Sequence, residues 1–159
     1  MARTNNAISH YRMANLIENG KAKFEYEFLE NYEAGIELLG FEVKSVRNHR
    51  GSLLGAHIIV RGGEAYIINM EIPPYQPGNT PKDYDPKRNR RLLLTKKELA
   101  ELAEKDNAKG LTIIPVSLYN KGRKIKVNVA IVRGKKTHDK RETIKKRDVD
   151  REMRRTLKE

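Results

Sequence analysis

The sequence of 159 residues contains no cysteine and no tryptophan. The lack of cysteine excludes disulfides, cysteine-ligated zinc and a thiol nucleophile, and it suits a cytosolic protein without requiring that location. No apolar run approaches the roughly 20 residues that span a bilayer, and residues 1–11 lack the apolar stretch of a secretory signal. We therefore expect a soluble, unprocessed cytoplasmic protein that makes no membrane contact.

Motifs for catalysis and nucleotide binding are also missing. The chain contains no GxxxxGK[ST], GxGxxG or HExxH motif and no acidic calcium loop. A Glu42-x-Lys44 pair is compatible with half of a metal-dependent nuclease motif, but it lies in a predicted helix, where an exposed charged face is the better interpretation. We expect no enzymatic activity, no cofactor and no metal, since the histidines lack the spacing of metal ligands. The four are His10, His49, His57 and His138.

Positive charge is what the sequence has in excess. Lys and Arg number 33 against 21 Asp and Glu, which gives a formal net charge of +12. Residues 133–159 hold twelve Lys or Arg and six Asp or Glu, so 12 − 6 leaves +6, half of the total, in the last 27 residues. A basic body with a basic tail predicts a large polyanionic partner, RNA before anything else, with an affinity that falls steeply with salt.

The first half of the chain predicts a strand followed by a helix. Residues 1–18 are expected to form a flexible N-terminus. Apolar and charged residues alternate over 23–30, which predicts a strand with one buried face. Asn31 as N-cap and apolar residues at helical spacing predict an amphipathic helix over 31–47. Gly35 and Gly40 inside that helix suggest close packing against another element.

Turn and cap signals define the remaining elements. Gly62-Gly63 separates two β-branched runs, 56–61 and 64–70, as in a hairpin. Five prolines make 71–89 a long loop, and the capping box at Thr95 begins a second helix. Two more strands, 111–119 and 124–132, flank Gly122, with Pro115 at an edge or a bulge. The predicted fold of residues 19–133 is mainly β with helices: a small antiparallel OB-like β-barrel, closed or partly open, with two or three helices.

Two clusters of basic residues in the body are candidate RNA contacts. The loop run at 85–91 places Arg88, Arg90 and Arg91 beside three leucines, so these cations are held next to a segment anchored in the core. In the last strand, Lys124 and Lys126 share one face and apolar residues take the other. An ordinary polar face that solubilises the sheet is the alternative for this strand, and the other basic segments favour RNA binding instead.

The basic C-terminal tail, residues 134–159, has its own helical pattern. Val149, Met153 and Leu157 recur every four residues. This stripe is too thin to hold a helix by itself, so we expect a segment that is disordered in isolation and becomes helical against a polyanion. A solubilising tail without a defined partner is the alternative.

Four segments together resemble one family. They are EAGIELLGFEVKSVR (33–47), DPKRNRRLLL (85–94), GLTIIPVSLYNKGRKIKV (110–127) and GKKTHDKRETIKKRD (134–148). In this order they resemble the SsrA-binding protein family, the small protein B of bacteria. The resemblance covers nearly all of the chain from Asn19 onward and departs only at the two ends.

The resemblance implies a non-enzymatic protein with an OB-like barrel. Such a protein binds the tRNA-like domain of transfer-messenger RNA, aids its aminoacylation, and delivers it with GTP-bound elongation factor Tu to stalled ribosomes for trans-translation. Within the ribosome, the tail would occupy the decoding centre of the small subunit and the empty message channel. We expect a monomer in solution. The alternative is a general ribosome- or structured-RNA-binding protein without preference for transfer-messenger RNA.

The resemblance and the charge pattern together give two sets of candidate residues. Whether Glu33 accepts hydrogen bonds from RNA or only stabilises its helix N-terminus stays open. The RNA-binding candidates are Asn19, Tyr26, Glu33, Arg88, Arg90, Arg91, Leu93, Lys124 and Lys126. The candidates for the ribosome-directed tail are Lys135, Lys136, His138, Asp139, Lys140, Arg141, Lys145, Lys146 and Arg147.

Overall fold

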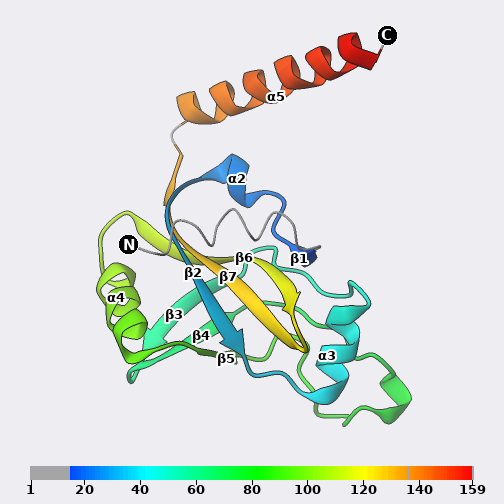
Figure 1. Ribbon diagram of the computed structural model, residues 1–159. Helices are drawn as coiled ribbons and strands as arrows, with labels where there is room; N and C mark the ends of the chain where they lie inside the picture. The colour runs from blue at the N-terminus through cyan, green and yellow to red at the C-terminus, as the bar shows by residue number, and fades with distance from the viewer. Residues whose placement is uncertain (1–14, 136, 159) are drawn as a thin grey trace.

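The computed structural model describes residues 15–135 and 137–158, which form one antiparallel sheet with helices around it (Figure 1). The sheet has seven strands in the order β1-β6-β7-β2-β5-β4-β3. Its strands are β1 Asn15–Glu18, β2 Tyr26–Ile36, β3 His57–Arg61, β4 Glu64–Ile68, β5 Arg90–Leu93, β6 Leu111–Lys121 and β7 Lys124–Gly134. The helices are α2 Ala22–Glu25, α3 Gly40–Arg47, the 3₁₀ helix η1 Pro77–Asn79, α4 Lys96–Asp106 and α5 Thr137–Lys158.

The two predicted hairpins are confirmed. The loop Gly62-Gly63 joins β3 to β4, and both glycines have positive φ, 59° and 74°, as a tight two-residue turn requires. Gly122, with φ 63°, lies in the turn between β6 and β7. Pro115 lies at a register shift between β6 and β7, so its place at a bulge is also confirmed.

The prediction for residues 23–47 is only partly correct. Residues 22–25 form the short helix α2, and β2 begins at Tyr26. The predicted helix over 31–47 is wrong in its first third, because β2 continues to Ile36 and α3 begins at Gly40. Residues 23–47 carry both the alternation typical of a strand and the apolar spacing typical of a helix. Pairing with β7 along the length of β2, which buries Tyr32 and Ala34, determines the outcome.

Two strands were missed by sequence analysis, and both are short. The strand β1 begins at Asn15, inside the segment expected to be a flexible terminus, and pairs with β6. The strand β5 lies between β2 and β4. The long loop over 71–89 and the helix α4, with the Thr95 hydroxyl accepting a hydrogen bond from the Glu98 backbone N–H at 3.2 Å, are confirmed.

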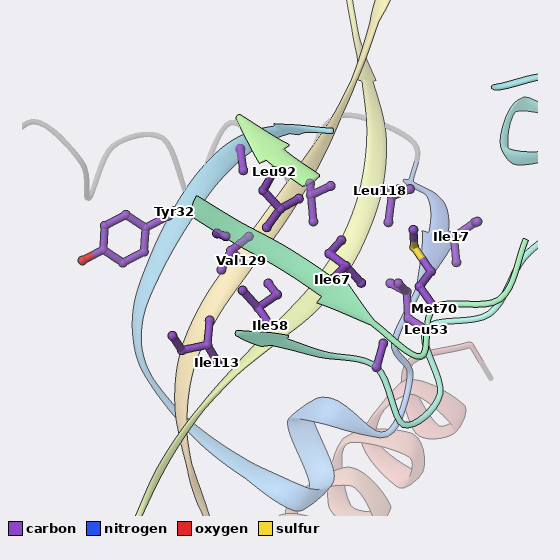
Figure 2. Packing of buried hydrophobic residues seen from close by; sticks show 14 of the residues in the cluster. Ile17, Tyr32, Leu53, Ile58, Ile67, Met70, Leu92, Ile113, Leu118 and Val129 are labelled. Carbon is purple, nitrogen blue, oxygen red and sulfur yellow. The ribbon is translucent and has the colours of Figure 1, made fainter. Parts of the chain in front are cut away.

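A closed barrel is not what the structure shows. The strand order ends at β1 on one side and β3 on the other, so the sheet stays open, although β3 comes close to β6. Apolar side chains fill the space between the two halves of this curved sheet. Figure 2 shows Ile58, Ile67 and Val129 pointing into that space, where they are 0–1% exposed. The architecture is therefore an open, curved antiparallel sheet with one principal core.

A second, smaller apolar cluster covers part of the opposite face. Ala22 of α2 packs there against Ile114, Ala130 and Val132 of β6 and β7. The two core clusters are built from residues 16–132. The helix α5 follows β7 and projects away from the sheet beside α2, whereas α3 lies at the opposite end of β2 (Figure 1). The fold therefore separates the basic tail from the end of the sheet that α3 covers.

Candidate nucleic-acid interface

Residues from four strands meet in one transverse row on the outer face of the sheet. Lys126 of β7 lies opposite Tyr119 of β6 and Gly35 of β2, and Gly35 lies opposite Leu93 of β5. Residues in register on neighbouring strands point to the same face, so strand pairing brings together side chains that are far apart in the sequence. We call the outward side chains of Glu33, Leu93, Lys124 and Lys126 the platform.

Leu93 is an exposed apolar side chain held in a fixed place. It is 49% exposed. A Cβ atom added to Gly35 would lie 3.1 Å from the Cβ of Leu93, so the side chain of Leu93 lies directly on the bare backbone of β2. The predicted close packing at Gly35 is confirmed, whereas Gly40 meets nothing within 4 Å. An ordered, exposed leucine beside cations is suited to contact a ribose or a base.

Glu33 does not stabilise a helix N-terminus, because it lies within β2, opposite Asn128. Its carboxylate accepts a hydrogen bond from the Tyr119 hydroxyl at 2.5 Å and from the Lys121 ammonium at 2.7 Å. Burial and the hydrogen bond to Glu33 raise the pKa of Tyr119. Sequence analysis missed both partners. The i, i+2 spacing of Tyr119 and Lys121 in a strand, which puts them on one face, was the signal available.

Lys124 and Lys126 lie as predicted. They alternate with Ile125 and Val127, which are buried in the core, so both lysines point to the outer face. Lys124 is exposed and Lys126 is half-buried. The predicted basic stripe on the last strand is therefore confirmed as an arrangement of side chains.

Arg90 requires a correction, because its side chain is 0% exposed and cannot reach an RNA from this position. It donates to Glu42 Oε2 at 2.7 Å and to the backbone carbonyls of Met70, Arg88 and Pro86 at 2.7–3.0 Å. β5 alternates, so Arg90 and Leu92 point into the core while Arg91 and Leu93 point outward. Arg90 is thus a core residue that anchors β5.

Glu42 is the buried partner of these arginines. It is 0% exposed, so the predicted exposed charged face of α3 is wrong at this position. Arg88 pairs with the same carboxylate, and the Tyr84 hydroxyl donates to it at 2.9 Å. Burial alone would raise the pKa of Glu42, but hydrogen bonds from Arg88 and the Leu39 backbone and the charge of Arg90 together lower it. This network ties α3, the long loop and β5 together behind the platform.

Arg91 faces outward but has partners within the protein. It donates to Glu64 at 2.8 Å and to Glu37 at 2.5 Å, and its side chain is 39% exposed. The hydrogen bonds that Arg91 donates to Glu37 and Glu64 raise its pKa. Of the three loop arginines predicted to contact RNA, Arg90 is buried. Arg88 and Arg91 form ion pairs with carboxylates of the protein itself.

Asn19 and Tyr26 lie at different levels of the sheet. The Asn19 backbone N–H donates to the carbonyl of Val116, next to the Ser117–Asn128 pair of β6 and β7, whereas Tyr26 pairs with Gly134 at the start of the tail. From Tyr26 to Gly35 is nine residues of β2, about 30 Å at roughly 3.3 Å per residue. Tyr26 therefore belongs to a second surface, distinct from the platform, whereas Asn19 lies at the level of Glu33 in the sheet.

The tail begins at this second surface. The Lys135 ammonium donates to the Lys23 carbonyl at 2.9 Å, and its backbone N–H donates to Glu25. Lys136 lies outside the described residues, and the structure places His138, Asp139 and Lys140 on α5 through their backbone alone. Further along α5, the side chains of Arg141, Lys145, Lys146 and Arg147 are exposed. The predicted helical tail is confirmed as a helix, and its disorder in isolation stays a prediction.

The described residues contain neither a cluster of metal ligands nor a membrane-spanning helix. Within residues 15–135 and 137–158, no three His, Cys, Asp or Glu side chains are grouped so as to hold a metal ion. None of the described helices is long and apolar enough to cross a membrane.

A basic face on an antiparallel sheet and a separate, exposed basic helix are together typical of RNA-binding proteins, and this is the class that the fold and the site indicate. Comparison with known proteins is more specific. The chain belongs to the SmpB protein family, whose profile matches residues 16–159.

Several relatives are similar over most of their length. An SsrA-binding protein from Mesoplasma florum is 50% identical over 140 residues, covering 88% of this chain and 94% of the relative. One from Gloeothece citriformis is 46% identical over 143 residues, covering 90% and 92%. A chain in a solved structure described as "tmRNA-SmpB: a journey to the center of the bacterial ribosome" is 43% identical, with a TM-score of 0.65 over 76% of this chain and 85% of that one.

Proposed function

We propose that this protein binds the tRNA-like domain of transfer-messenger RNA and delivers it to stalled ribosomes, where the nascent chain is tagged for degradation. The relatives are named SsrA-binding proteins, and the solved structure places its SmpB with this RNA on the ribosome. The platform is the observation that carries the proposal for this chain. Lys124, Lys126 and the pinned Leu93 present charge and an apolar contact on one rigid face.

The two ends of the sheet have different tasks in this proposal. The platform binds a structured RNA by shape and by backbone charge, because side chains cannot read the base edges in the deep, narrow major groove of a double-stranded RNA. The tail, from Lys135 to Arg147 and beyond, enters the decoding centre and the message channel, where its cations meet ribosomal RNA. The protein acts without catalysis, in the cytoplasm, and elongation factor Tu joins it through the shared RNA. In this proposal the RNA binds to the curved, open sheet as it would to the surface of an OB-like barrel.

A competition binding assay tests the RNA preference. Labelled transfer-messenger RNA is bound to the full-length protein and displaced with unlabelled transfer-messenger RNA or with bulk tRNA at the same salt concentration. We expect the transfer-messenger RNA to displace the label at a concentration at least ten-fold lower. Equal displacement by both RNAs would favour the alternative function, a general structured-RNA-binding protein, which the excess of surface lysine and arginine alone would support.

A further inference from the structure

A carboxylate on an RNA-binding face requires an explanation. Glu33 lies on the platform two positions along β2 from Gly35, the residue that pairs with Lys126, and a negative charge there repels phosphate. Its side chain is 19% exposed, whereas that of its partner Lys121 is 48% exposed. The Glu33 side chain is therefore mostly buried, whereas the Lys121 side chain that pairs with it is more exposed to solvent.

The hydrogen bond to Glu33 holds the Lys121 side chain in place but leaves it exposed. Glu33 Oε1 accepts from Lys121 Nζ at 2.7 Å, and Oε2 accepts from the Tyr119 hydroxyl at 2.5 Å. Tyr119 is 1% exposed, so the tyrosine fixes the carboxylate from within the protein. A lysine on a four-carbon stem normally loses side-chain entropy when it is immobilised at an interface. Here that ordering precedes RNA binding.

Lys121 also continues the basic stripe of β7. It lies opposite Lys124 across the β6–β7 pair, and Lys124 shares the outer face with Lys126. An ammonium has three donors, so Lys121 keeps donors for a phosphate oxygen while one is held by Glu33. The three lysines then follow the outer face around the end of the hairpin.

We propose that Lys121 is a further RNA-contacting cation of the platform, and that Glu33 and Tyr119 are positioning residues that act through it. This inference rests on the proposed function and assigns the role of Glu33 within it. The simplest alternative is a structural ion pair that only links β2 to β6. A direct contact of Glu33 with a base or a 2′-hydroxyl is the other.

A double-mutant cycle separates these roles. The affinity for transfer-messenger RNA is measured between 50 and 200 mM salt for wild-type protein, Glu33→Gln, Lys121→Gln and the double variant. Loss of one phosphate contact makes the slope of log K against log salt less steep by about 0.7–0.9. The ratio of the wild-type affinity to the Lys121→Gln affinity should therefore fall about three-fold over this range of salt concentration. Glu33→Gln should also weaken binding, although it raises the net charge. In the Lys121→Gln background it should cause no further loss.

Two more variants serve as controls for this experiment. Lys121→Arg should restore most of the salt slope, because a guanidinium also pairs with phosphate. Lys97→Gln, a change at an exposed lysine of α4, is the matched control and should leave the slope unchanged. Thermal unfolding of each variant shows that it is folded at the assay temperature.

The outcomes distinguish this inference from the proposed function. An unchanged slope for Lys121→Gln with lowered thermal stability would show a purely structural ion pair. Losses that add in the double variant would show that Glu33 contacts the RNA itself. Either result overturns the inference while the wild-type preference for transfer-messenger RNA stands. Absence of that preference in the wild type would instead overturn the proposed function.

Discussion

The substitution Arg90→Met distinguishes a core arginine from an RNA-binding arginine. Methionine has a similar length and no charge, so it fills the space but removes every hydrogen bond of the guanidinium. Glu42 would then keep Arg88 as its arginine partner, and that side chain is 30% exposed. The carbonyls of Met70, Arg88 and Pro86 would each lose a donor.

The expected loss of stability is large. Removing one partner of a buried ion pair costs about 3–5 kcal/mol, because the remaining charge stays buried without full compensation. Arg90 and Glu42 are both 0% exposed, so solvent screening does not reduce this figure much. In a domain of 159 residues, with about 2–4 °C of melting temperature per kcal/mol, the loss corresponds to roughly 10 °C.

Urea unfolding followed by circular dichroism measures this loss, and RNA binding below the melting temperature completes the experiment. The folded fraction of Arg90→Met should bind transfer-messenger RNA with the wild-type salt slope. Arg91→Met is the matched control in the same strand, because its side chain faces outward, and it should lower the stability much less. Wild-type stability together with a lowered salt slope in Arg90→Met would refute the reasoning.

Two further predictions concern the platform and the network behind it. Gly35→Ala should shift Leu93 by a few tenths of an ångström and weaken RNA binding several-fold, measured by filter binding; unchanged affinity would show that the position of Leu93 is unimportant. The pKa of Glu42 is lowered in the folded protein, so its contribution to stability is present above its ordinary pKa of about 4.3 and is lost as pH falls through the lower folded value. Urea unfolding between pH 7 and 3 should show this loss, and Glu42→Gln should flatten it; an equally steep loss in the variant would assign it to other carboxyl groups.

Local signals predicted the elements whose causes are local. Gly62 and Gly63 set the β3–β4 turn through their positive φ, and the hydrogen bonds of the capping box at Thr95 set the start of α4. The alternation of Lys124 and Lys126 with apolar neighbours in β7 also needs no partner to be recognised. These parts of the fold follow from a few adjacent residues.

Elements determined by pairing across the sheet were missed or misjudged. The segment around Glu33 carries helical and strand patterns at once, and only the partner strand β7 decides between them. Arg90 looks like a surface cation until Glu42, 48 residues away in the sequence, is placed beside it. The Glu33–Lys121 pair joins positions 88 residues apart. The charge of a residue is visible in the sequence, whereas its burial depends on the fold.

The central claim is that the sheet binds the RNA and the tail acts on the ribosome. The core clusters lie within residues 16–132, so a protein truncated after Lys136 should stay folded. The direct test measures its affinity for transfer-messenger RNA and its support of nascent-chain tagging on stalled ribosomes. We predict nearly intact affinity and no tagging, whereas equal loss of both would contradict the division of labour between platform and tail.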